Sequence, residues 1–336
     1  MGISLKTHKM LWGRSGGRCS IPDCRKILFV DETETDDPSI VGDEAHIVAR
    51  EQDGPRGDSP LTTEDRDKYD NLILLCKIHH KVIDDQPKAF TVELLHKIKH
   101  DHIEWFKGSG NFDEAKQRDD EIYATYVEKW IQLSGLNEWN NWSSFVFGGG
   151  QPHIPKEIHT QLKELVHYLL SRLWPERYKE LESALTNFRL VLNDFINVFN
   201  EHISKDDEEM LWTEKFYKIP HYDEELYHSL SRKFDYHVDL VEDLMLELTR
   251  AGNYVCDKVR KFVSPSFRLN EGVLLVTSGP HMDLKYHTSR VEYREEERTE
   301  YPYPGLKEFM TLRASRDRHY GEGYSADYFI QTGPEE

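Results

Sequence analysis

Cysteine and histidine side chains gather in two short clusters within the first quarter of this 336-residue chain. Cys19 and Cys24 lie in the segment CSIPDC, and Cys76, His79 and His80 follow about 50 residues later in CKIHHKVID. Two such pairs can close a tetrahedral site on Zn²⁺, because zinc prefers thiolate and imidazole ligands. The spacing therefore predicts a zinc site in this part of the chain.

The favoured ligand set is Cys19, Cys24, Cys76 and His79, because this choice leaves His80 available for a second site. His79 and His80 are neighbours, so their side chains point apart and the two residues could exchange roles. Four protein ligands leave no open position on zinc, which predicts a structural metal site.

A second polar set consists of His46 in GDEAHIVA, Asn71 in DNLILLC, and His80, which keep the order H…N…H. A histidine can remove a proton from water, and one divalent ion can supply positive charge to a phosphate oxygen. Phosphodiester hydrolysis is therefore a chemistry that these residue types could perform. For His46 considered alone, a buried structural histidine is the simpler interpretation.

These residues lie in a longer pattern of GDEAHIVARE, GPRGD, TTEDRDKYDNLILLC and FTVELLHKIKHDHIEW. The pattern resembles the HNH, or ββα-metal, endonuclease family over residues 10–107, less than a third of the chain. The resemblance implies that His46 is the general base and that His80 binds a catalytic Mg²⁺ or Mn²⁺. It also implies that Asn71 holds the loop and orients the base.

The sequence departs from the commonest HNH pattern where Ala45 stands in place of a metal-binding aspartate. An alanine cannot bind metal. Glu44 is one candidate for the missing carboxylate, as both a catalytic residue and a metal ligand, although an exposed strand residue is an equally good interpretation. Asp43 could also substitute, or the ion could be bound by His80 with another carboxylate such as Asp84.

Three basic residues are candidate phosphate contacts. Arg56 lies in a predicted loop rich in Gly, Pro and Asp, whereas Lys97 and Lys99 lie in a predicted helix over residues 91–106 with a threonine at its N-cap. Such residues position a nucleic acid without reading its sequence. For the two lysines, ordinary solvated surface is at least as good an interpretation.

Composition excludes several classes of protein. No apolar run approaches the roughly 20 residues of a membrane span, so no membrane association is expected. The amino terminus lacks the apolar stretch of a secretory signal, and only 4 cysteines occur, which together favour a cytoplasmic protein.

Charge is unevenly distributed along the chain, whose net charge is -18. Residues 1–110 carry 16 Lys and Arg against 20 Asp and Glu, a net of -4, which leaves -14 for the rest. Binding to phosphates requires basic side chains, so the acidic remainder is a poor DNA clamp. It is better interpreted as a regulatory or oligomerisation region.

Hydrophobic periodicity and the resemblance together predict an α+β chain. Residues 1–110 are expected to form a zinc-supported HNH domain, residues 111–155 a helical and aromatic linker, and residues 156–336 a mainly helical domain. The helical patterns cover residues 156–203 and 223–263. From residue 264 onward the pattern changes to short strands such as GVLLVTS.

The sequence as a whole favours a metal-dependent DNA endonuclease, restrained by its C-terminal domain until a partner protein or small ligand binds, or assembled by that domain into a homo-oligomer. The resemblance to stand-alone bacterial HNH proteins suggests an effector of defence against phage or foreign DNA. One alternative is a restriction-type nuclease whose C-terminal domain reads DNA. Another is a non-catalytic, zinc-supported nucleic-acid or protein interaction module, for which Ala45 is the best argument.

Overall fold

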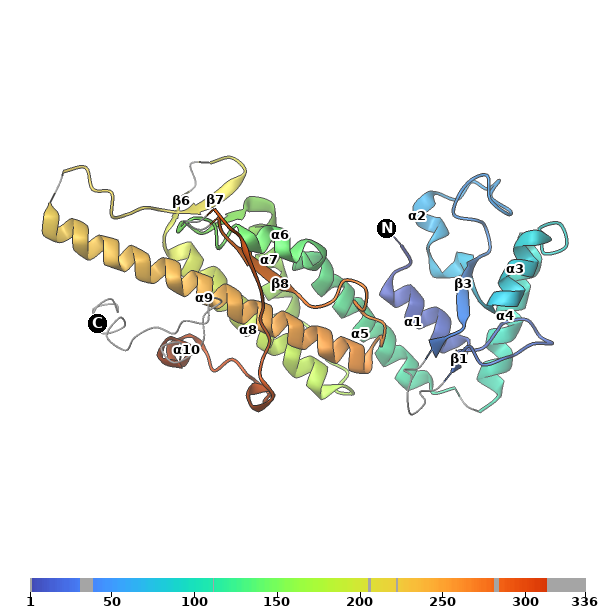
Figure 1. Cartoon of the computed structure of the whole chain (residues 1–336). Helices are drawn as coiled ribbons and strands as arrows, with labels where there is room; N and C mark the ends of the chain where they lie inside the picture. Colours follow the sequence, from blue (N-terminus) through green and yellow to red (C-terminus); the bar gives the residue numbers. More distant parts are fainter. Residues whose placement is uncertain are drawn as a thin grey trace. The chain divides into compact units, whose positions relative to one another are not determined.

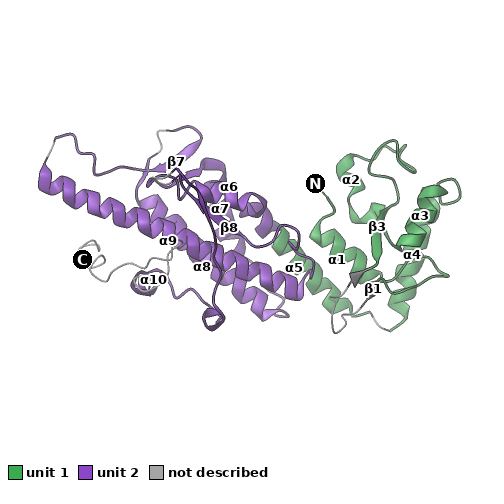
Figure 2. Cartoon of the chain, in the orientation of Figure 1, with its two compact units in different colours: residues 1–128 green, residues 129–336 purple. Residues whose placement is uncertain are grey.

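The structure is a computed structural model that describes residues 2–30, 39–110, 112–204, 207–221, 223–280 and 284–312. The chain forms two compact units, residues 1–128 and 129–336 (Figure 2). Helices and small antiparallel sheets occur together, which confirms the predicted α+β class. The boundary between the units falls inside helix α5 (Glu114–Leu133), so the predicted linker over residues 111–155 is divided between them.

The first unit is built on an antiparallel pair of strands, β3 (Gly42–His46) and β4 (Leu72–Cys76), followed at once by helix α3 (Lys77–Asp85) (Figure 1). Helices α1 (Leu5–Arg14) and α4 (Val92–Gly108) pack against β4. Among its described residues the unit also contains the smaller elements β1 (Phe29–Val30), β2 (Ser39–Ile40), α2 (Thr63–Arg66) and the 3-10 turn η1 (Tyr69–Asn71).

Strand β4 has the sequence LILLC, and all of its residues are buried, as expected for a continuous apolar run at the centre of a small core. Its partner β3 pairs Ala45 with Ile73 and His46 with Leu72. Because side chains alternate along a strand, Asp43 and Ala45 occupy one face of β3 while Glu44 and His46 occupy the other. This alternation decides which polar side chains can meet.

Helix α4 begins where the sequence predicted. The hydroxyl of Thr91 accepts a hydrogen bond from the backbone N–H of Leu94, a cap of the kind that stabilises a helix by about 1 kcal/mol. Leu95 faces the core of the first unit, whereas Lys97 is exposed. The helix therefore closes the core with one face and meets solvent with the other.

The second unit contains two long helices that pack together, α8 (Lys179–Glu201) and α9 (Glu224–Phe262), with α7 (Lys156–Leu170) against α8 (Figure 1). The predicted helical stretch over residues 156–203 is thus interrupted between Leu170 and Lys179. Smaller elements are η2 (Leu136–Glu138), α6 (Trp139–Ser144), η3 (Glu295–Glu297) and α10 (Leu306–Leu312).

Two small sheets belong to the second unit. Strands β5 (His153–Pro155), β7 (Met210–Thr213) and β6 (Ile203–Ser204) form one in the order β5-β7-β6. Strands β8 (Leu275–Ser278) and β9 (His287–Arg290) form the other, and β8 lies in the predicted GVLLVTS strand. In the described residues 291–312 the β-rich prediction is wrong, because the chain there forms η3 and helix α10, and the remainder, residues 313–336, lies outside the described residues.

Aromatic side chains form much of the second unit's core. Trp130 meets Phe188 edge to face at 5.6 Å between ring centroids, and Trp139 meets Trp142 at 5.0 Å. Over the described ranges, no helix has both the length and the apolar character needed to cross a membrane.

Candidate functional site

The predicted zinc ligands come together in the first unit. Cys19, Cys24, Cys76 and His79 each place one ligand atom within 4.8 Å of the others. Nδ1 of His79 lies 3.1 Å from Sγ of Cys76 and 3.6 Å from Sγ of Cys19, so this nitrogen faces the cluster. Ligands of a tetrahedral zinc ion with bonds of about 2.3 Å lie roughly 3.8 Å apart. The four side chains therefore form a site that could hold a metal ion such as zinc.

Local backbone structure positions the four ligands. The chain turns tightly between Cys19 and Cys24, where the N–H of Cys24 donates to the carbonyl of Ile21 at 3.0 Å. The N–H of Ser20 donates to Leu74 at 2.9 Å, which fixes this turn to β4. Cys76 ends β4 and precedes the first residue of α3, so His79 follows one helical turn later on the same side.

Burial raises the pKa of the Cys19 thiol to about 12, and the neighbouring thiols of Cys76 and Cys24 act in the same direction. Ionising this thiol inside the unit requires a compensating positive charge. A bound zinc ion would provide it, so metal binding and loss of the thiol proton are coupled.

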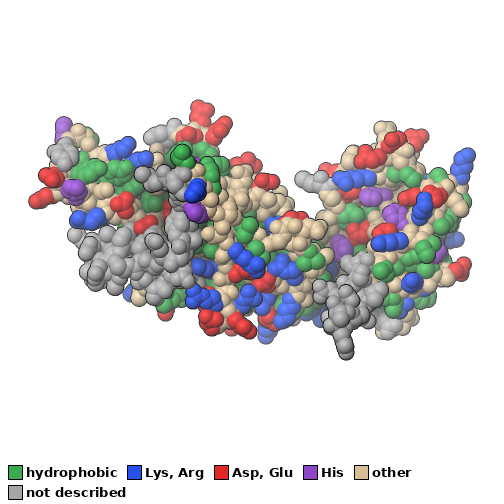
Figure 3. Space-filling model, in the orientation of Figure 1, with side chains coloured by type: hydrophobic (Ala, Val, Ile, Leu, Met, Phe, Trp, Pro, Cys, Tyr) green, Lys and Arg blue, Asp and Glu red, His purple; other side chains and the backbone are tan. Residues whose placement is uncertain are grey.

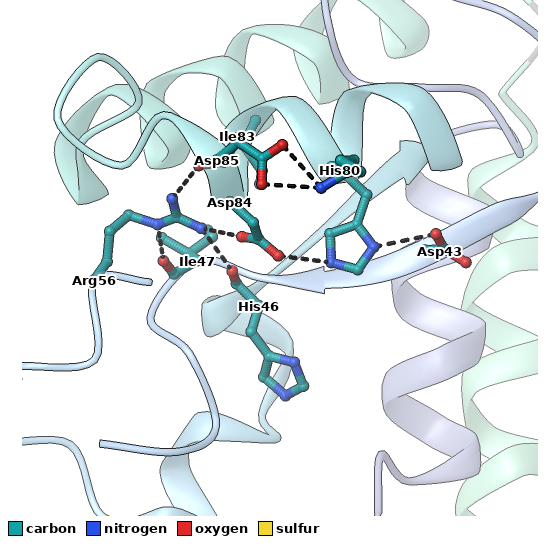
Figure 4. Close-up of polar contacts among 9 residues, drawn as sticks. Asp43, His46, Ile47, Arg56, His80, Ile83, Asp84 and Asp85 are labelled. Carbon is teal, nitrogen blue, oxygen red and sulfur yellow. Dashed lines mark hydrogen bonds and ion pairs between the residues drawn. The ribbon is translucent and has the colours of Figure 1, made fainter. Parts of the chain in front are cut away.

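His80 lies between two carboxylates, one from β3 and one from its own helix. Its Nδ1 is 3.1 Å from Oδ2 of Asp43, and its Nε2 is 3.4 Å from Oδ2 of Asp84 (Figure 4). Neighbouring ligands of an octahedral ion with bonds of about 2.1 Å lie roughly 3.0 Å apart. Either pair of atoms therefore has a separation that suits a divalent cation. The three side chains are 33 to 37% exposed, so solvent reaches them.

His46 is paired with a different carboxylate. Its Nε2 lies 2.9 Å from Oδ1 of Asp67, whose other oxygen is 3.6 Å from Arg50. The ring is directed away from His80, on the other side of β3 (Figure 4). Within the described part of the chain, no hydrogen bond joins these two histidines. The structure thus brings His80 together with Asp43 and Asp84, but not with His46.

Asn71 binds backbone and does not contact the imidazole of His46. Its Oδ1 accepts from the N–H of Val48 at 2.9 Å, and its Nδ2 donates to the carbonyls of Val48 and Arg66 at 2.8 and 2.9 Å. Its own carbonyl accepts from Ile47 at 2.8 Å. These bonds fix the segment directly after His46.

Glu44 does not lie beside His80, where a carboxylate ligand of the catalytic metal was expected, but contacts helix α1 instead. Its Oε1 accepts a hydrogen bond from Nε1 of Trp12 at 2.8 Å and lies 2.5 Å from Nδ1 of His8, both on α1. The alternation along β3 turns Glu44 toward α1 and Asp43 toward α3. The carboxylates that lie beside His80 are therefore Asp43 and Asp84.

Two of the three predicted phosphate contacts, Arg56 and Lys99, are bound to other groups inside the first unit. Arg56 is only 4% exposed in its side chain and donates to the carbonyls of Ile47 and Ile83 at 2.6 Å each, as well as to Asp84. Lys99 is 7% exposed and donates to the carbonyl of Tyr69. Burial lowers the pKa of Lys99 to about 8. Arg56 and Lys99 would have to leave these partners to reach a phosphate, whereas Lys97 is exposed.

Sequence reasoning missed Asp67 and His8. Asp67 is one of 4 acidic residues in TTEDRDKYDN, and nothing in the spacing distinguishes it from the others. His8 lies just outside the resemblance, which begins at residue 10. Only the packing of α1 and of the loop before η1 places these side chains against Glu44 and His46.

On the face drawn in Figure 3, histidine, acidic and basic side chains lie next to one another on the first unit. No protein-family model matches the chain. A search among curated proteins also gives no match.

Proposed function

We propose that this chain is a divalent-metal-dependent DNA endonuclease whose first unit is stabilised by a structural zinc ion. The observation that carries the proposal is that two adjacent residues of α3 face different groups. His79 lies with the three cysteines, and His80 lies beside two carboxylates. A rigid metal site of this kind would hold a second, solvent-accessible ligand group in a fixed position. Preorganised ligand groups of this type are what metal-assisted hydrolysis requires.

His46 is proposed as the general base. Its contact with Asp67 supports this role, because a carboxylate on Nε2 fixes the ring and selects the tautomer. With the proton on Nε2, Nδ1 is the nitrogen that takes a proton from the attacking water. The side chain is 23% exposed, so water reaches it.

Asp43 and His80 are proposed as the ligands of Mg²⁺ or Mn²⁺. Asp84 is the weaker candidate, because Arg56 lies 2.8 Å from it and already compensates its charge. A divalent ion bound to Asp43 and His80 would supply positive charge to the phosphate oxygens. Glu44 takes no part in this proposal, since its carboxylate is bound to α1.

Residues 129–336, the second unit, carry 25 Lys and Arg against 35 Asp and Glu, a net charge of -10, which argues against a DNA clamp in this unit. Its regulatory or assembly role is proposed from the architecture. The defence role, the activating partner or ligand and the homo-oligomer remain predictions that rest on the resemblance and the architecture.

The test is a plasmid-nicking assay on the full chain with Mg²⁺ or Mn²⁺ and with a chelator. Cleavage should require the metal, and His46→Ala should reduce it by about 10²- to 10⁴-fold, as removal of a general base does. His100→Ala, at an exposed position on α4, is the matched control and should cleave like the unmodified protein. A folded protein that binds DNA without cutting it in any of these metals would favour the interaction-module alternative.

A further inference from the structure

A second group of ligand-type side chains lies in the second unit, where α8 ends beside α9. Glu201 is the last residue of α8, His202 follows it, and His237 is in α9. One ligand atom from each lies within 4.8 Å of the others. The two imidazole rings are 4.8 Å apart between centroids and perpendicular to one another. The proposed nuclease site uses none of these residues.

His237 provides an independent indication that a ligand belongs here. The residue is only 5% exposed, and its Nε2 is buried without a hydrogen-bond partner among the described residues. Buried polar atoms in folded proteins are almost always paired, so an unpaired one requires an explanation. The ring of Phe216 lies 4.2 Å from that of His202, so the surroundings of this group of side chains are partly apolar. A metal ion would satisfy the unpaired nitrogen.

The end of α8 also favours a cation. The last carbonyl groups of a helix concentrate negative partial charge, and a positive charge near them is stabilising. The last turn of α8 contains no basic side chain, and Glu201 adds a further negative charge. Glu201 is exposed while His237 is buried, so the group extends from the surface to the interior.

We infer that Glu201, His202 and His237 form a second zinc site, separate from the cysteine cluster. A donor set of two imidazoles and one carboxylate binds zinc in preference to magnesium. Three protein ligands leave one coordination position for water or an anionic group, in contrast to the closed set of three cysteines and one histidine.

The decisive experiment measures metal and does not depend on nuclease activity, so it stands or falls separately from the proposed function. The full chain is dialysed against Zn²⁺, and the bound zinc per chain is determined by mass spectrometry. The unmodified protein should bind two ions, and His237→Gln should lose one of them. With Co²⁺ in place of zinc, His237→Gln should keep the thiolate-to-cobalt absorption of the cysteine cluster.

Two further variants keep the result interpretable. Glu201→Gln changes an exposed side chain that does not support the core, and it should weaken binding of the second ion by about tenfold or more. His228→Gln, at an exposed position on the same helix, should bind zinc like the unmodified protein. The inference is overturned if the unmodified protein binds no zinc beyond the cysteine cluster. It is also overturned if both His237→Gln and Glu201→Gln bind as much zinc, as tightly, as the unmodified protein.

Discussion

His79 and His80 are adjacent on α3, yet their side chains belong to two different groups. Nδ1 of His79 lies 3.1 Å from Sγ of Cys76, and Nδ1 of His80 lies 3.1 Å from Oδ2 of Asp43. Successive residues of a helix with 3.6 residues per turn point about 100° apart, so one helix can present a ligand to each group. This separation makes the two histidines experimentally distinguishable.

His79→Ala should abolish metal binding at the cysteine cluster and lower the melting temperature, because metal binding there is coupled to folding. His80→Ala should keep that metal and lose DNA cleavage. The thiolate-to-cobalt absorption reports the cluster, thermal denaturation reports stability, and plasmid nicking reports activity. The opposite pattern in the two variants would show that their roles are exchanged.

Asp43→Asn should impair cleavage more than Asp84→Asn. Asp43 faces His80, whereas the charge of Asp84 is already compensated by Arg56 at 2.8 Å. We expect the Mg²⁺ concentration for half-maximal cleavage to rise at least about tenfold in Asp43→Asn, and less in Asp84→Asn. Titration of nicking activity with Mg²⁺ measures both, and equal effects would contradict the assignment of Asp43 as the ligand.

Asp67→Asn should lower the cleavage rate by positioning His46 poorly, with an expected loss of roughly 10- to 100-fold. Asp67→Asn should have no further effect on the cleavage rate in a protein that already lacks the imidazole of His46. The double variant of His46→Ala with Asp67→Asn should therefore be no slower than His46→Ala alone, since residues that act as a unit are not additive. Additive losses in single-turnover cleavage would mean that Asp67 acts on something other than His46.

The pH dependence of stability should report Lys99. Its pKa in the folded protein is lowered to about 8 from an ordinary 10.5, so between these values the folded state binds fewer protons than the unfolded state. Stability therefore rises with pH across this window, by at most about 1.4 kcal/mol per unit. Denaturant unfolding of the unmodified protein and of Lys99→Met should show this slope only in the former. Parallel pH profiles would contradict it.

A fragment of residues 1–133, which keeps α5 whole, should retain DNA affinity and should cleave at least as fast as the full chain if the second unit restrains the nuclease. Residues 134–336, which the fragment lacks, carry 24 Lys and Arg against 35 Asp and Glu, a net charge of -11, and negative charge repels a polyanion over a Debye length of roughly 8 Å. Binding and nicking assays on the fragment and the full chain provide the comparison. Loss of DNA affinity in the fragment, together with DNA binding by residues 134–336, would favour the restriction-type alternative.

The sequence by itself determined the parts that depend on residue type and local spacing. Cys19, Cys24 and Cys76 are candidate metal ligands because zinc prefers thiolates, whatever their place in the fold. The imidazole of His79 is a fourth candidate, because the residue follows Cys76 by one helical turn. The apolar run of β4 and the capped helix α4 were equally accessible, because burial and capping leave a pattern within a few residues.

Only the tertiary structure decided which side chains meet across distant segments. Asp43, and not Glu44, lies beside His80, because the side chains of β3 alternate between two faces. One face of β3 packs against α3 and the other against α1. The tertiary structure placed Arg56 and Lys99 inside, bound to backbone carbonyls that no sequence pattern marks. It also brought His237 to Glu201 and His202 through the packing of α9 on α8. Such pairings depend on how helices and strands far apart in the chain pack together, and this packing cannot be predicted from local spacing in the sequence.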